Sequence, residues 1–147
     1  SAEDAGDVTL VAFGAEEVQP GTEKHHVGSA AYVRRMTEAE RDGLEAMVSA
    51  DMVGKVRRPI VARLSGTRRG ATRLLAEAVR SAAMRPSVRG LPDISDHGSF
   101  ARAGMPAAFL WTGDEPNHHQ PSDVVSNVSP RALRRALRIL QALLALV

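Results

Sequence analysis

The strongest constraint on the fold is an alternation between short apolar runs and segments with helical periodicity. Strand-forming side chains are concentrated in four runs, at residues 8–13, 47–52, 59–64 and 105–111. Helical patterns lie between or after them, at residues 29–36, 37–46, 66–84, 95–104 and 130–147. Strands that alternate with helices build a layered α/β fold around a mostly parallel sheet. The sequence therefore predicts such a fold, with the first run as a buried strand.

Local signals predict several helix ends. Ser29 is the expected N-cap of the first helix. Thr37 and Glu40 form the pattern of a capping box for the second helix, and a Ser-Pro pair marks the start of the last one. Leucines are expected to form the buried stripe of that last helix: Leu133, Leu137, Leu140 and Leu144. Residues 86–92, with a proline at each end, are expected to be an irregular link.

Composition limits the classes of protein and site that need to be considered. The chain has 147 residues, 44% hydrophobic and 3% aromatic, so we expect one domain over residues 1–147 with a core of Ala, Val and Leu. The absence of cysteine excludes disulfides, thiol nucleophiles and cysteine-based zinc sites. A net charge of +2 and arginine pairs without interleaved aromatics favour solvated surfaces over a nucleic-acid interface. No apolar run approaches the roughly 20 residues of a membrane span.

Acidic and histidine residues follow three of the four predicted strands. Glu16 and Glu17 follow the first, Asp51 ends the second, and His118 and His119 lie in the loop after the fourth. Because ligands of such sheets gather at the carboxyl ends of the strands, we expect these side chains to meet. Carboxylate oxygens and imidazole nitrogens together can bind zinc. Taken singly, each signal has a simpler interpretation, as a surface turn, a cap or a solvated loop.

The adjacent glutamates can divide two tasks between them. Neighbouring residues of an extended segment point to opposite sides, so one carboxylate can bind a metal ion while the other faces the water above it. The metal ion would offset the repulsion between the two carboxylates. The free glutamate would then be the general base that deprotonates that water.

Four blocks of the sequence, in order and at similar spacing, resemble the M28 family of zinc aminopeptidases. The first two are VTLVAFGAEEVQPG and SADMVGK. The other two are SDHGSFARAGMPAAFLWTG and NHHQPSDVVSNVSPRALRRAL. The resemblance covers nearly the whole chain. It implies the C-terminal portion of a three-layer αβα sandwich with a mostly parallel mixed sheet, and hydrolysis of an N-terminal peptide bond by a water shared between two zinc ions.

The resemblance assigns roles to individual residues. Glu16 matches the family's general base, and Glu17 matches a carboxylate ligand of one zinc ion. Asp51 matches a ligand of the other zinc ion, and His119 matches the histidine ligand. His118 stands where the family usually has Tyr, and it is the second choice for the histidine ligand.

Further residues match the region where the family shapes its substrate side. Asp96 and His97, in the sequence Ser-Asp-His, lie in this region, with a helix N-cap as the alternative interpretation. Trp111 would line the same pocket or belong to the core. His25 and His26, in a loop longer than the family's, are expected to be solvated, with a metal ligand as the alternative.

One part of the family's site has no match in this chain. Family members carry another histidine ligand and a bridging aspartate well before the Glu-Glu segment, whereas seven residues precede Val8 here. The acidic residues among those seven do not match that motif: Glu3, Asp4 and Asp7. Three of the family's five ligands are present, so we expect this chain alone to hold one zinc ion or none. A missing N-terminal segment or a second chain would supply the remainder.

These observations lead to three functional hypotheses. The first is a zinc-dependent, aminopeptidase-like hydrolase of peptides, incomplete in this chain. The second is a non-catalytic binding or dimerisation domain with the same fold. The third is a glutaminyl-cyclase-like acyltransferase with a single zinc ion. The tendency of the family implies an extracellular or periplasmic location.

Overall fold

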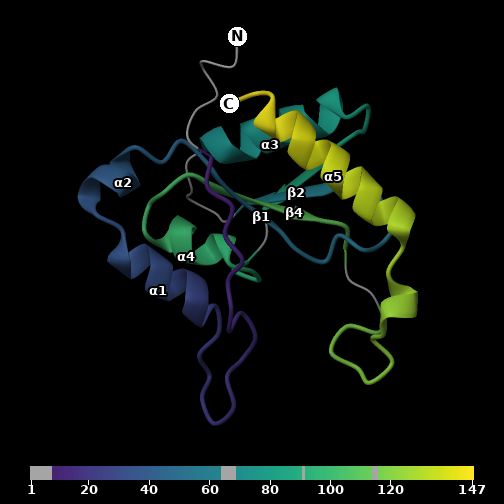
Figure 1. Ribbon diagram of the computed structural model, residues 1–147, viewed down its shortest axis with the longest axis horizontal. Helices are drawn as coiled ribbons and strands as arrows, with labels where there is room; N and C mark the ends of the chain where they lie inside the picture. The colour runs from purple at the N-terminus through teal and green to yellow at the C-terminus, as the bar shows by residue number, and fades with distance from the viewer. Residues whose placement is uncertain (1–7, 64–68, 91, 114–115) are drawn as a thin grey trace.

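The centre of the molecule is a mixed sheet that joins segments far apart in the chain. The computed structural model describes residues 8–63, 69–90, 92–113 and 116–147 (Figure 1). Within these ranges the strands are β1 (Met47–Ala50), β2 (Ile60–Arg63), β3 (Ser87–Gly90) and β4 (Ala107–Trp111). Their order is β1-β4-β2-β3, with β1 parallel to β4, β2 parallel to β3, and β2 antiparallel to β4. The predicted mostly parallel mixed sheet is confirmed.

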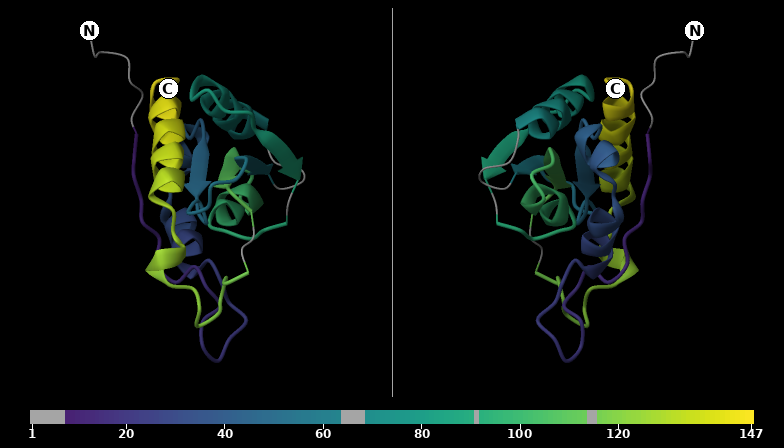
Figure 2. Two further views of the ribbon diagram at one scale, coloured as in Figure 1. Left: turned by 90° about the vertical axis from the view of Figure 1, so that its right-hand side faces the viewer. Right: turned by 90° about the vertical axis from the view of Figure 1, so that its left-hand side faces the viewer.

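Helices cover both faces of this sheet and complete the three layers. They are α1 (Val27–Arg35), α2 (Glu38–Asp42), α3 (Arg69–Ser81), α4 (His97–Arg102) and α5 (Pro130–Leu144). Figure 2 shows α5 and α4 on opposite sides of the sheet. No helix in the described ranges is long and apolar enough to span a membrane.

Strand β4 is buried along its whole length because both of its faces are covered. Ala108 and Leu110 face the core that α3 and α5 share with the sheet. Ala107 and Phe109 belong to clusters on the opposite side, where α1 and α4 pack. The continuous apolar sequence of this strand, Ala-Ala-Phe-Leu-Trp, is what burial on two faces requires.

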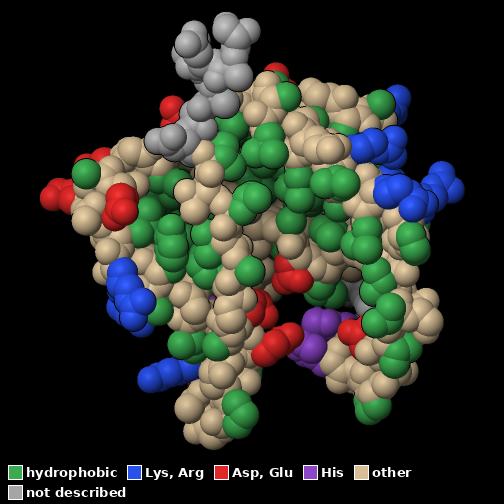
Figure 3. Space-filling view, in the orientation of Figure 1, with side chains coloured by type: hydrophobic (Ala, Val, Ile, Leu, Met, Phe, Trp, Pro, Cys, Tyr) green, Lys and Arg blue, Asp and Glu red, His purple; other side chains and the backbone are tan. Residues whose placement is uncertain are grey.

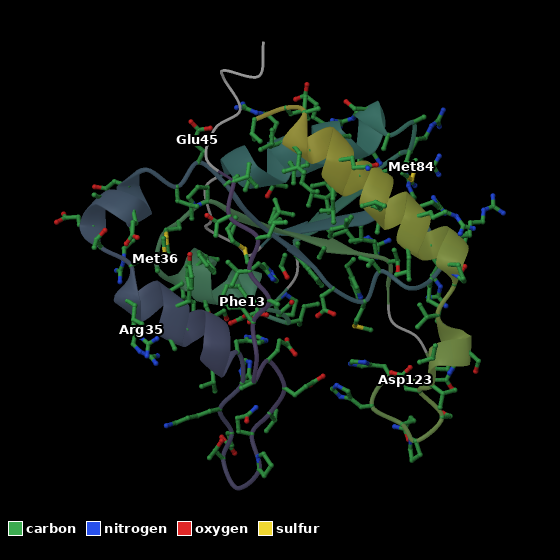
Figure 4. All side chains as sticks on the ribbon, in the orientation of Figure 1. Phe13, Arg35, Met36, Glu45, Met84 and Asp123 are labelled. Atoms are coloured by element: carbon green, nitrogen blue, oxygen red, sulfur yellow. The ribbon has the colours of Figure 1, made fainter. Side chains whose placement is uncertain are left out.

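The apolar run at residues 8–13 does not form the predicted strand. It has no strand hydrogen bonds, and Val8 and Leu10 are 49% and 88% exposed. Phe13 is the exception, because its ring packs against Tyr32 and Phe100 beside α4 (Figure 4). A buried strand needs a packed layer on each face. The described residues provide such cover for Phe13 but not for the rest of the run.

The buried face of α5 also differs from the prediction. Ala132, Ala136 and Ile139 are buried, whereas Leu133 and Leu137 are 46% and 54% exposed. Leu144 is exposed as well, and Leu140 is partly buried against the core. The apolar residues form one arc, opposite the arginines, that is broader than a single contact face, so periodicity alone does not select which part of the arc is buried. The small alanines lie on the face that packs inward.

Other local predictions had mixed outcomes. The capping box at Thr37 is present, with Glu40 as its partner. Ser29 is not the N-cap of α1; His26 occupies that position with a left-handed φ of 53°, and the Ser29 hydroxyl instead contacts Ser99 of α4 at 2.9 Å. The predicted ends of two elements, at residue 64 and residues 66–68, lie outside the described residues.

The segment predicted as an irregular link between two prolines contains a strand, β3. It pairs in parallel with β2, and Ser87 N donates to the Pro59 carbonyl at 2.8 Å. Val88 in this strand is 50% exposed. An edge strand is held by backbone hydrogen bonds to one neighbour. It can form without an alternation of buried and exposed side chains, and so its sequence need not carry a strand pattern.

Candidate active site

The two adjacent glutamates lie on a bend of the backbone, just after Ala15 with its left-handed φ of 54°. The Oε1 atom of Glu16 lies 3.0 Å from Nε2 of His26. The Oε1 atom of Glu17 lies 2.9 Å from Nε2 of His119. The two carboxylates therefore reach different partners. They lie at a bend and not on the extended strand end that was predicted to point them apart.

Glu17 and His119 are 102 positions apart in the sequence and form a contact across the two loops. Both side chains are more than half exposed, at 64% and 59%. The loop that carries His119 is tied to the loop after β1, because Thr112 Oγ1 donates to the Met52 carbonyl at 2.7 Å. His118 stacks on the His119 ring with 3.7 Å between the centroids. Figure 3 shows acidic and histidine side chains facing each other across a hollow at this end of the molecule.

Asp51 follows β1 directly, as predicted, and a buried serine holds its carboxylate. Ser95 Oγ donates to Asp51 Oδ2 at 3.2 Å, and the same hydroxyl lies 3.2 Å from Ser49 Oγ in β1. Asp51 N donates to the Leu110 carbonyl at 3.2 Å, so its backbone extends the β1–β4 pairing. The position of this carboxylate is thus set by the sheet and by the segment before α4.

The carboxyl group of Glu16 has a strongly perturbed pKa. Burial, and after it the negative charges of Asp51, Glu17 and Asp96, together raise the pKa from 4.5 to about 7, while His119 opposes them. These charges act on one another because the fold brings their segments to one end of the sheet. A carboxyl group with a pKa near neutrality is suited to general base catalysis.

The residues expected on the substrate side lie deeper than the glutamates. His97 is fully buried, its ring stacks on Phe109 at 4.9 Å, and burial lowers its pKa to about 4. Neither ring nitrogen of His97 has a hydrogen-bond partner among the described residues. Trp111 is 7% exposed and stacks on Phe109. Asp96 is the N-cap of α4, but its side chain makes no capping hydrogen bond.

A series of contacts from Glu16 through His26 to Asp93 and Arg102 was not predicted, although His26 had a metal ligand as its alternative interpretation. His26, expected in a solvated loop, is 3% exposed, whereas His25 is exposed. The other ring nitrogen of His26 lies 3.4 Å from Asp93 Oδ1, and Asp93 pairs with Arg102 of α4. The sequence carries one signal for this arrangement, which is the Gly28 that follows His26 and allows close backbone contact.

The described residues offer part of a metal site. Glu17 and His119 present one oxygen and one nitrogen donor within 2.9 Å of each other, which are ligand types that zinc accepts. A zinc site uses three or four protein donors. No group of three or more such side chains is assembled within the described ranges, so Asp51 does not complete a site with this pair. The residues present therefore do not fit a complete zinc site.

Residues 2–144, nearly the whole chain, match the sequence model of peptidase family M28. The chain belongs to peptidase family M28. The match extends over the Glu-Glu bend, the Asp51 segment and the histidine loop, and so it confirms the family indicated by the four sequence blocks. A comparison with curated proteins found no significant match.

Solved aminopeptidases share the fold of this M28 chain. An aminopeptidase from Aneurinibacillus sp. strain AM-1 is 27% identical, with a TM-score of 0.76 over 90% of this chain and 31% of the other. A zinc aminopeptidase from Bacillus subtilis is 30% identical, with a TM-score of 0.73 over 90% of this chain and 34% of the other. The chain thus spans about a third of the length of these enzymes. A glutaminyl cyclase from an Acidobacteriales bacterium is 17% identical with a TM-score of 0.68, and it shows the fold alone.

Proposed function

We propose that this chain is the C-terminal portion of a zinc-dependent aminopeptidase that hydrolyses N-terminal peptide bonds. The observation that carries the proposal is the contrast between the two neighbouring glutamates. Glu16 is partly buried with a pKa near 7, whereas Glu17 is exposed and contacts His119. One carboxyl group is thus suited to move a proton and the other to bind a cation.

Each residue then has a distinct task. Glu16 accepts a proton from the water that attacks the peptide carbonyl and can return it to the leaving amine. Glu17 and His119, which contact each other, would hold one zinc ion, and Asp51, to which Ser95 donates a hydrogen bond, would contribute to a second. When bound, zinc polarises the carbonyl and lowers the pKa of water. The remaining ligands would come from a further segment or chain, because the described residues do not bring three ligand-type side chains together.

Metal content and hydrolysis of an aminoacyl anilide test this proposal together. We expect zinc in the assembled protein, and a loss of hydrolysis in Glu16→Gln with zinc content unchanged, since Glu16 is not a proposed ligand. Glu45→Gln is the matched control, because Glu45 is exposed and lies far from the histidine loop (Figure 4). Zinc-independent hydrolysis, or full activity in Glu16→Gln, would contradict the assigned roles.

The fold shared with a glutaminyl cyclase supports a second candidate. One zinc ion on the Glu17–His119 pair, with cyclisation of N-terminal glutamine and no release of amino acids, would favour that reaction. A protein that binds no zinc at micromolar concentration and performs neither reaction would instead be a non-catalytic binding domain.

A further inference from the structure

His26 is held in a position that the proposed chemistry does not explain. It is 3% exposed, and its backbone has a left-handed φ of 53°. Non-glycine residues rarely adopt this conformation, and the surrounding structure must compensate its cost. The compensation here is a double connection to Glu16, through a 2.7 Å hydrogen bond from His26 N to the Glu16 carbonyl and through the 3.0 Å side-chain contact.

The ring of His26 lies between two carboxylates and edge-on to the ring of His25, whose Nδ1 is 3.0 Å from His26 Nδ1. Nε2 is 3.0 Å from Glu16 Oε1, and Nδ1 is 3.4 Å from Asp93 Oδ1. Asp93 is anchored in turn by its ion pair with Arg102 of α4. Rotation of the imidazole ring would break both carboxylate contacts at once. Asp93 Oδ1 makes no hydrogen bond with any residue that the structure describes, so its contact with the His26 ring is one of charge and packing. Arg102, Asp93 and His26 form a connected series of side chains, the line of support, that ends at the Glu16 carboxyl group.

Two glycines near this line of support lie where a larger residue would collide with its neighbours. A Cβ atom on Gly98 would collide with the Asp93 carboxylate, and one on Gly28 would collide with the carbonyl oxygen of Gly14. Val27 N donates to the Ala15 carbonyl at 2.9 Å, which closes the loop on the other side of His26. The Asp93 carboxylate thus needs a glycine at position 98, and the loop that carries His26 needs one at position 28 to approach Gly14.

We propose that His26 is a positioning residue for Glu16, oriented by Asp93 and Arg102. This inference rests on the proposed function, because positioning matters only if Glu16 moves a proton. The imidazole ring keeps the Glu16 carboxyl group turned away from Glu17 and His119, so that it does not compete for the cation. An outer partner that orients a site group in this way typically contributes about 10- to 100-fold in activity.

Two substitutions of similar size separate positioning from packing. His26→Gln keeps an N–H group that can reach Glu16, and His26→Leu removes it. We expect kcat to fall about 10- to 100-fold in His26→Leu with KM changed less than about twofold, and kcat to stay within about threefold of wild type in His26→Gln. Both substituted residues must adopt the same left-handed backbone conformation. Equal thermal midpoints of the two variants would therefore show that a folding defect does not explain the difference in kcat. Equal loss of kcat in both variants would overturn the proposal.

A second measurement does not depend on hydrolysis. In the metal-free protein, ¹⁵N NMR signals of the His26 ring should shift in Glu16→Gln and in Asp93→Asn, and should not shift in Asp42→Asn, a surface control in α2. If the wild-type protein hydrolyses nothing, the proposed function fails, and these signals alone decide whether His26 is linked to Glu16 and Asp93. If the His26 ring signals shift in neither Glu16→Gln nor Asp93→Asn, the proposal is overturned.

Discussion

Replacing Glu16 with Gln should stabilise the folded chain at neutral pH while it removes the proposed base. In the folded chain, burial and the neighbouring carboxylates raise the Glu16 pKa from 4.5 to about 7. Between these two pH values the unfolded chain has released this proton and the folded chain still holds it. The free energy of unfolding therefore falls as the pH rises through this window. Below it, both states are protonated and the penalty disappears.

The size of this penalty follows from the pKa and from exposure. A rise from 4.5 to about 7 corresponds to at most about 3.4 kcal/mol, at 1.36 kcal/mol for each pKa unit. The Glu16 side chain is 27% exposed, so solvent screens part of the effect and we expect about 1–2 kcal/mol. Gln cannot ionise, and the stability advantage of Glu16→Gln over wild type should grow by this amount between about pH 4 and about pH 8.

Urea unfolding of the two proteins across this pH range is the assay. A chelator must be present, because a bound cation would favour the ionised carboxylate and mask the effect. Glu45→Gln, at an exposed glutamate, should give a curve parallel to wild type. A difference between Glu16→Gln and wild type that does not change with pH would refute the assigned environment of Glu16. A higher free energy of unfolding in Glu16→Gln would show that the wild-type chain is less stable because it keeps an ionisable carboxyl group at this site.

Three further experiments, two of them with a control substitution, test the fold and the metal pair. Ile139→Ala should lower the free energy of unfolding by about 2–4 kcal/mol because it opens a cavity in the α3–α5 core, whereas Leu137→Ala on the exposed face should cost less than about 1 kcal/mol in the same urea assay. Equal losses would mean that the outer face of α5 is covered in solution. Gly28→Ala should cost about 2 kcal/mol or more through its collision with backbone, while Gly70→Ala, with open space around it, should be neutral or stabilising by up to about 1 kcal/mol. His119→Ala should weaken zinc binding in calorimetry at least about tenfold, equivalent to about 1.4 kcal/mol, and unchanged affinity would exclude it as a ligand.

The family and the class of fold could be predicted from the sequence because their signals are local or ordered along the chain. The alternation of strand and helix patterns indicated the layered fold, and β4 and the Thr37 capping box followed directly from nearby residues. The glutamates, Asp51 and His119 were selected because each follows an apolar run. The structure places Glu17 and His119 in contact, which agrees with that reasoning.

The predictions of secondary structure and burial that were wrong share a physical cause. Whether a segment is buried depends on which other parts of the chain cover it. Residues 8–13 have the composition of a buried strand, yet no layer in the described part of the chain covers them except at Phe13. The leucines of α5 form a regular stripe, but the alanine face packs inward. β3 has no buried alternation at all and exists because β2 offers a free edge.

The sequence by itself determined the kind of chemistry available to this protein, because carboxylates and imidazoles at ordered spacings limit which ions and protons the chain can handle. Only the tertiary structure decided what each group can do. Burial at the end of the sheet raises the pKa of Glu16, and the packing of α1 against α4 brings His26 and Asp93 to its side. Desolvation and charge proximity act through space, and spacing along the chain contains neither quantity.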